Sequence, residues 1–186
     1  GLGKTATTGD TLLLDNGTTV RLADIKAPEY WPGNTPYKSW PHGRRSKEAL
    51  KALTRDTSLT FFCVRRRQNM FGDLLAHVKL PDGRWLQEVL VTNGDSLFYP
   101  SIATPEITQS LRDAEKQAQH HKKGMWALKA FKATNALGPD LKTGWFQTVR
   151  GTIVKPAKVR DKFYLNFGDD WRTDFTIEFE KRIEKQ

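Results

Sequence analysis

Residues 11–22 read TLLLDNGTTVRL, two short apolar runs on either side of Asn16-Gly17. An Asn-Gly pair between two such runs is the strongest short-range signal of a β-hairpin, because a tight turn needs residues that adopt positive φ. The segment therefore predicts antiparallel strands over residues 11–14 and 19–22, with both turn residues at positive φ.

Working outward, the chain alternates short strands with a few helices. Ser46 is the expected cap of a helix that reaches Arg55. Further strands are expected over 58–65 and 74–80, and further helices over 86–93 and from about 105 to 123. A segment rich in Ala, Asn, Gly and Pro then suggests a linker. Beyond it, strands are expected over 146–155, 162–167 and 174–179. We expect a first domain over residues 1–130, a linker over 131–143 and a β-rich extension over 144–186.

The composition favours a polyanionic partner. The 186 residues include 30 Lys and Arg against 21 Asp and Glu, a net charge of +9. Such an excess of positive charge is typical of proteins that bind nucleic acid. The single cysteine, Cys63, excludes a disulfide within this sequence and any metal cluster built from cysteines. No run of about 18 apolar residues is present, so we expect no membrane partner.

Four separated motifs occur in a consistent order: Gly9-Asp10-Thr11, residues 20–29 (VRLADIKAPE), residues 71–76 (FGDLLA) and residues 123–126 (KGMW). Together they resemble the staphylococcal nuclease-like (thermonuclease) family over about residues 5–128. The strand-rich C-terminal part resembles an extension found in bacterial members, and looks like the opening strands of a second oligonucleotide-binding-type barrel.

The resemblance implies a mainly β, α+β fold: a five-stranded oligonucleotide-binding-type barrel with about three helices. It also implies hydrolysis of phosphodiester bonds in DNA or RNA with one calcium ion. At the family's positions, Asp10 would be a metal ligand, Glu29 the base that activates water, and Arg21 one of two arginines that neutralise charge on the phosphorus. Calcium prefers several oxygen ligands, and phosphoryl transfer depends on charge stabilisation and positioning.

Two positions depart from the family pattern. Lys26 stands where the family has its second metal carboxylate, and Asp73 stands where it has its second arginine. At roughly 4 Å and an effective dielectric near 20, each like-charge pair costs about 4 kcal/mol. Loss of one transition-state stabiliser typically lowers the rate by about 10²–10³. We therefore expect a degenerate calcium site and weak or absent phosphodiesterase activity.

The two reversed charges are complementary, and we expect Lys26 and Asp73 either to form an ion pair across the former metal site or to have changed independently. A further alternative preserves activity. Asp24 lies two residues before Lys26, so in a strand it would share its face and supply the missing metal oxygen.

Several residues are candidates for binding single-stranded DNA or RNA. Arg65, Arg66 and Arg67 form a run of three guanidinium groups that either contacts phosphates or forms a solvated rim. Phe71 and Tyr99 stand where the family has aromatic residues that stack on a base, and rim packing is the alternative.

Three functions remain open: a nucleic-acid-binding protein with a degenerate site, an active calcium-dependent endonuclease using Asp10, Asp24 and Glu29, or a protein-interaction scaffold. No small-molecule cofactor is expected. The resemblance implies export as one location, although no signal segment is visible in this sequence.

Overall fold

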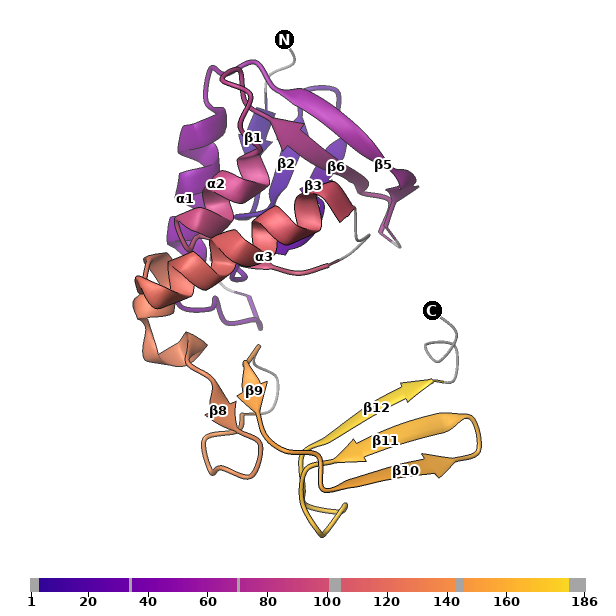
Figure 1. The fold of residues 1–186 in the computed structure, drawn as a ribbon. Helices are drawn as coiled ribbons and strands as arrows, with labels where there is room; N and C mark the ends of the chain where they lie inside the picture. The colour runs from indigo at the N-terminus through magenta and orange to yellow at the C-terminus, as the bar shows by residue number, and fades with distance from the viewer. Residues whose placement is uncertain (1–3, 34, 70, 101–104, 143–145, 181–186) are drawn as a thin grey trace. The chain divides into compact units, whose positions relative to one another are not determined.

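The computed structural model describes residues 4–33, 35–69, 71–100, 105–142 and 146–180 (Figure 1). The chain divides into two compact units, Gly1–Lys129 and Ala130–Gln186. Each unit has its own sheet, and the two are described separately below.

The first unit is built on a five-stranded mixed sheet in the order β1-β2-β3-β6-β5. The strands are β1 (Lys4–Ala6), β2 (Thr11–Leu14), β3 (Thr19–Leu22), β5 (Thr60–Gln68) and β6 (Leu74–Lys79). Neighbouring strands are antiparallel except β3 and β6, which run parallel. A short antiparallel pair joins β4 (Ile25–Lys26) to β7 (Leu97–Phe98). This arrangement is consistent with the expected oligonucleotide-binding-type fold.

The predicted hairpin is confirmed, with Leu12 of β2 opposite Val20 of β3 and both side chains buried. Its turn differs from the expectation. Gly17 has φ 80°, whereas Asn16 is not among the residues at positive φ. The Gly17 N–H donates to the Leu14 carbonyl (2.9 Å), so a single left-handed glycine is enough to close the turn.

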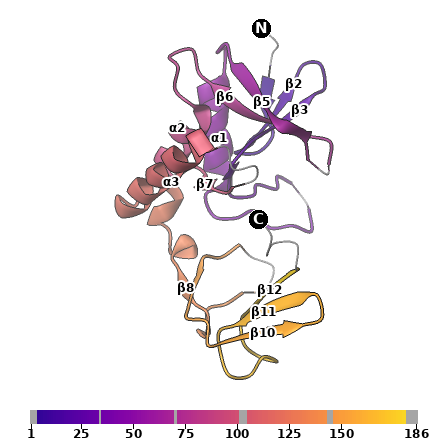
Figure 2. The same cartoon turned by 45° about the vertical axis from the view of Figure 1, so that its right-hand side comes forward.

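Three α-helices gather on one side of this sheet (Figures 1 and 2). They are α1 (Gly43–Thr54), α2 (Leu86–Thr92) and α3 (Pro105–His120). Leu50, Leu90 and Leu111, one from each helix, are fully buried in the same core cluster as Leu12 and Leu22 of the sheet. Burial of a leucine side chain contributes about 1.5–3 kcal/mol, so these contacts hold the helices to the strands.

Helix α1 begins four residues earlier than predicted, and Ser46 is not its cap. His42 precedes the helix with φ 72°, and Ser46 is fully buried within the first turns. Gly43 explains the early start, because a Cβ there would lie 2.4 Å from the Glu29 carbonyl oxygen. The close backbone approach places the start of α1 directly against the segment that carries Glu29.

In the second unit, β10 (Lys155–Val159), β11 (Lys162–Asn166) and β12 (Thr176–Glu180) form an antiparallel sheet. No strand was expected over residues 156–159, because the strand expected over 146–155 ended at Lys155, where β10 begins. The segment expected as a linker, 131–143, includes β8 (Thr134–Asn135), which pairs in parallel with β9 (Val149–Arg150). Within the described residues, no helix has the length and apolar character needed to cross a bilayer.

The ends of α2 and α3 meet backbone to backbone at two glycines. Gly94 follows α2 with φ 72°, and its carbonyl accepts a hydrogen bond from the Met125 N–H (2.9 Å). A Cβ at Gly94 would lie 2.2 Å from the Lys123 carbonyl oxygen. Position 94 therefore requires glycine, both because its φ is positive and because there is no space for a Cβ.

We expect Gly94→Ala to lower the free energy of unfolding by roughly 2–5 kcal/mol, the sum of left-handed strain and overpacking. Gly17→Ala is the matched control, since Gly17 also has positive φ but nothing lies within 4 Å of its Cβ position. That variant should lose only about 1–2 kcal/mol. Urea unfolding measures both; equal losses would contradict the crowding at Gly94.

Glu115 links α3 to β7, because its Oε1 accepts a hydrogen bond from the Phe98 N–H (2.9 Å). Burial raises the pKa of Glu115 above its ordinary value of 4.5, and the Phe98 N–H only partly opposes this. The folded state therefore prefers the protonated carboxyl, and the stability this gives is lost as pH rises through the raised pKa.

Glu115→Gln should remove this dependence while keeping an acceptor for the Phe98 N–H. Relative to the variant, the unsubstituted protein should lose stability as the pH rises above 4.5 and through the raised pKa of Glu115. Melting temperatures of both proteins across this range measure the difference. A constant difference would show that burial does not shift the ionisation of Glu115.

Candidate functional site

The candidate residues meet where the first sheet brings distant segments together. Asp10 lies just before β2, Arg21 is on β3, Lys26 ends β4, and Asp73 lies just before β6. Glu29 follows β4 by three residues. Because β3 and β6 are parallel neighbours, with Arg21 opposite Leu75, the start of β6 brings Asp73 to Arg21.

Asp10 is buried and its carboxylate is fully engaged. Oδ1 accepts hydrogen bonds from the hydroxyls of Thr8 (2.7 Å) and Thr11 (2.9 Å), and Oδ2 accepts one from the Ala27 N–H (3.0 Å). Arg21 Nη1 lies 3.9 Å from Oδ1. The residue implied as the first metal ligand therefore joins the turn before β2 to the segment after β4.

Arg21 also contacts Asp73, with its Nε 3.3 Å from Asp73 Oδ2. Asn69 holds this aspartate in place: its Nδ2 donates to the same Oδ2 (2.9 Å), and its Oδ1 accepts from the N–H groups of Phe71 and Asp73. The guanidinium thus lies between two carboxylates, those of Asp10 and Asp73.

Lys26 forms an ion pair with Glu29, with 2.7 Å between Nζ and Oε1. Both side chains are about a quarter exposed. The ammonium also lies 5.6 Å from the centroid of the Trp40 ring, within the range of a cation–π contact. The glutamate implied as the base therefore has a cation on one of its oxygens.

The predicted ion pair between Lys26 and Asp73 is wrong. Within the described residues, Lys26 pairs with Glu29 and Asp73 pairs with Arg21. Each substituted residue has bound the retained residue nearest to it. The reason is local geometry: Glu29 lies three residues from Lys26, while Asn69 and Arg21 fix Asp73 elsewhere.

The placement expected for Asp24 is also wrong. It lies between β3 and β4 with φ 59°, so it is not in a strand and the alternation of side chains does not apply to it. Its buried carboxylate Oδ2 lies 3.1 Å from Nε2 of His77, which is also buried. Asp24 is therefore engaged in the core by a partner that the sequence did not indicate.

The two candidate stacking residues flank the site and are exposed. Phe71, 77% exposed, is in the same turn as Asp73, and Tyr99, 52% exposed, donates its N–H to the Asp24 carbonyl (3.0 Å). The side chains of Arg65, Arg66 and Arg67 lie outside the described residues, so their contact with phosphate stays a prediction.

The carboxylates of Asp10, Asp73 and Glu29 each already bond to groups of the protein. Calcium takes 6–8 oxygen ligands. Here both oxygens of Asp10 already accept hydrogen bonds. One of these bonds comes from the N–H of Ala27, and the residue before Ala27 is Lys26, which carries a positive charge. Over the described part of the chain, no group of three or more His, Cys, Asp or Glu could hold a metal.

The sequence analysis missed the residues that position the charges. Thr8 and Asn69 were not singled out, yet they hold Asp10 and Asp73. For Asn69 a signal existed, since Asn before a Gly-containing turn often bonds to backbone N–H groups two residues on. His42, the residue before α1, also has a charged neighbour, since its Nε2 lies 2.9 Å from Asp95 Oδ1.

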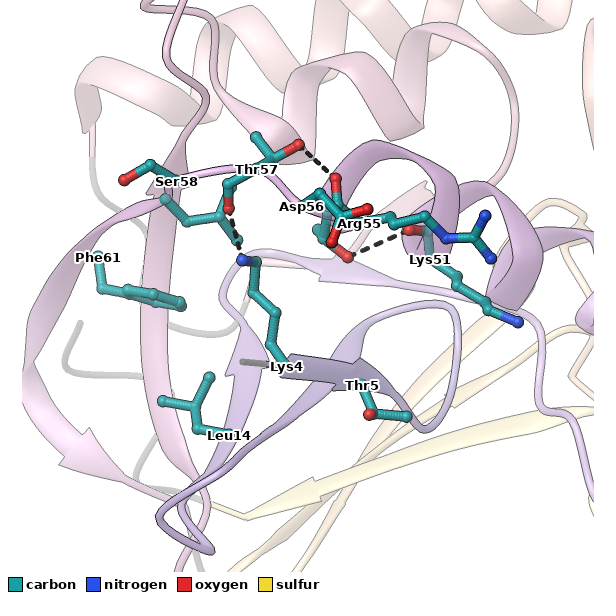
Figure 3. A pocket seen from close by; sticks show the side chains of 11 residues that line it. Lys4, Thr5, Leu14, Lys51, Arg55, Asp56, Thr57, Ser58 and Phe61 are labelled. Carbon is teal, nitrogen blue, oxygen red and sulfur yellow. Dashed lines mark hydrogen bonds between the residues drawn. The ribbon is translucent and has the colours of Figure 1, made fainter. Parts of the chain in front are cut away.

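A hollow of about 820 Å³ lies elsewhere on this unit, between β1, the end of α1 and the segment that follows (Figure 3). Lys4, Lys51 and Arg55 line it, and Lys4 Nζ donates to the Thr57 carbonyl. None of the candidate residues described above lines it, so we assign the site by its side chains and not by this hollow.

Two comparisons with known proteins bear on the first unit. A family model described as staphylococcal nuclease homologue matches residues 19–128, more than half of the chain. The chain is also similar to a protein of Oryza sativa subsp. japonica named "Probable staphylococcal-like nuclease CAN1", with 29% identity over 109 residues. The match covers 58% of this chain and 28% of the rice protein.

We expect Asp10→Ala to lower the free energy of unfolding by about 1–3 kcal/mol, because it leaves the buried Ala27 N–H without an acceptor. Asp10→Asn should cost less, since its Oδ1 can accept from Ala27 while its amide donates to Thr8. Urea unfolding of both variants checks this. If the alanine variant were as stable as the unsubstituted protein, the structural role of Asp10 would be refuted.

Proposed function

Because this chain belongs to the staphylococcal nuclease homologues, we propose that it binds single-stranded DNA or RNA and that its phosphodiesterase activity is weak or absent. The matched segment spans only about a quarter of the rice relative, so the activity of that whole protein does not transfer to this chain. The proposal rests on the charges around Arg21 and Glu29.

One observation supports the loss of activity: both retained catalytic positions are neutralised by the two substituted residues. Glu29 accepts a hydrogen bond from Lys26, which competes with a water molecule for the same oxygen. Arg21 faces Asp73, so a phosphate approaching the guanidinium also meets a carboxylate. At roughly 4 Å and a dielectric near 20, that repulsion is about 4 kcal/mol, comparable to the benefit expected from the arginine.

Two observations support binding. The chain carries a net charge of +9, which favours association with phosphates. Phe71 and Tyr99 expose aromatic rings, and bases stack on such rings regardless of their sequence. A protein-interaction scaffold would use neither feature, so salt-dependent binding of nucleic acid separates the two functions.

The first experiment measures cleavage and binding of a labelled single-stranded oligonucleotide with calcium and with chelator. We expect salt-dependent binding and no metal-dependent cleavage above that of Glu29→Gln. Calcium-dependent cleavage that disappears in Glu29→Gln would overturn the loss of activity. Absence of binding at about 50 mM salt would overturn the binding function and favour a scaffold.

A second experiment reverses both substitutions. Lys26→Asp together with Asp73→Arg should release Glu29 and Arg21 from their partners and add a carboxylate beside Asp10. We expect the double variant to bind calcium measurably more tightly than the unsubstituted protein in calorimetry. No gain in calcium binding by a folded double variant would count against the assignment of these residues to the family's positions.

A further inference from the structure

The segment between Glu29 and α1, residues 30–42, forms an aromatic loop that the proposed function has not used. Its backbone is held in place: Ser39 Oγ accepts from the Trp31 N–H (2.8 Å) and donates to the Trp31 carbonyl (3.1 Å). The Trp40 N–H donates to the Glu29 carbonyl (2.8 Å). These bonds close the loop and attach it to the residue implied as the base.

Two rings of this loop face solvent. Trp31 is 42% exposed and Tyr37 is 63% exposed, and their centroids lie 5.0 Å apart with the planes inclined at 36°. Neither belongs to the hydrophobic core clusters. An exposed aromatic pair on a loop held by hydrogen bonds is a surface on which another planar group can stack.

The loop also lies in a strongly basic stretch. Residues 26–47 contain five Lys and Arg and one Asp or Glu, so 5 − 1 = +4. The single acidic residue, Glu29, is paired with Lys26. Within the described residues, Lys38, Arg44 and Arg45 are exposed and have no carboxylate within 4.0 Å.

Folding does not account for these charges. Arg44 and Arg45 occupy the first turn of α1, which contains no acidic residue. Positive side chains there oppose the helix dipole and cost stability. A hollow of about 360 Å³ beside them is walled by Tyr30 and Trp40 on the loop side and by the two arginines on the helix side. The same surface thus offers flat rings and unpaired guanidinium groups.

We infer that the aromatic loop and the start of α1 form a second subsite for single-stranded nucleic acid, in which a base stacks on Trp31 and Tyr37 and phosphates contact Lys38, Arg44 and Arg45. This subsite rests on the proposed function, because it extends the same site: Trp40 contacts Lys26 through its ring and Glu29 through its N–H. An acidic peptide could pair with the same positive side chains, but it would have no group that needs to stack on both rings.

The test measures the affinity of the full chain for a labelled oligothymidylate and for an abasic oligonucleotide of the same length. Trp31→Ala and Tyr37→Ala should each weaken oligothymidylate binding by about five- to hundredfold, as expected for loss of a stacked base. Binding of the abasic oligonucleotide should change little. Trp31→Phe, which keeps a ring, should retain most of the affinity.

Two further variants test whether the arginines contact phosphates and whether the effect is specific to aromatic residues of this loop. Arg44→Gln with Arg45→Gln should weaken both probes and lower the slope of log affinity against log salt by about 1.4, the value for two phosphate contacts on a single strand. Trp171→Ala is the matched control for an exposed aromatic residue, since Trp171 is 67% exposed on the second unit. It should leave the affinity unchanged.

The outcomes separate this inference from the proposed function. In one outcome, the unsubstituted protein binds the oligothymidylate and Phe71→Ala weakens this binding. If the folded Trp31 and Tyr37 variants then bind as tightly as the unsubstituted protein, the second subsite is refuted and the proposed function stands. Equal weakening of the abasic probe in those two variants would also refute stacking. If the unsubstituted protein binds neither probe, both proposals fail, and a peptide becomes the better candidate for this surface.

Discussion

The buried carboxylate of Asp10 is the interaction on which the site depends. A charge removed from water must be matched by hydrogen bonds, and here two threonine hydroxyls and the Ala27 N–H supply them. The last of these bonds draws the segment after β4 against the turn before β2. Glu29 comes two residues after Ala27. The hydrogen bonds to the Asp10 carboxylate therefore determine the position of Glu29 and of the loop that begins there.

The two substituted charges redistribute the electrostatics of the site without changing its total. Asp10, Arg21, Lys26, Glu29 and Asp73 sum to 2 − 3 = −1. The set implied by the family, three carboxylates and two arginines, also sums to −1. What has changed is the pairing: positive and negative groups now neutralise each other within the protein.

The site and the aromatic loop are parts of one structure. Gly43 allows the start of α1 to approach the Glu29 carbonyl, and the Trp40 N–H bonds to the same carbonyl oxygen. The loop therefore leaves and returns to nearly the same point, and its Trp40 contacts both Lys26 and Glu29. A substitution at Glu29 that alters the backbone would disturb both surfaces, whereas substitutions at Trp31 or Tyr37 act on the loop alone.

The sequence by itself determined what depends on neighbouring residues. The apolar runs around Gly17 specify the hairpin, and the resemblance carried by the four motifs identifies the family. These features could be predicted because turn chemistry and hydrophobic periodicity act over a few residues.

Only the tertiary structure decided which charges meet. Lys26 had two candidate partners, the carboxylates of Glu29 and Asp73, and the sequence does not give the distance of either from its ammonium group. The parallel pairing of β3 with β6 and the side chain of Asn69 assign Asp73 to Arg21. Similarly, the left-handed backbone of Asp24 directs its carboxylate to His77, 53 residues away. Ion pairing depends on distances of a few ångströms between segments that the fold alone brings together, and a one-dimensional pattern carries no such distances.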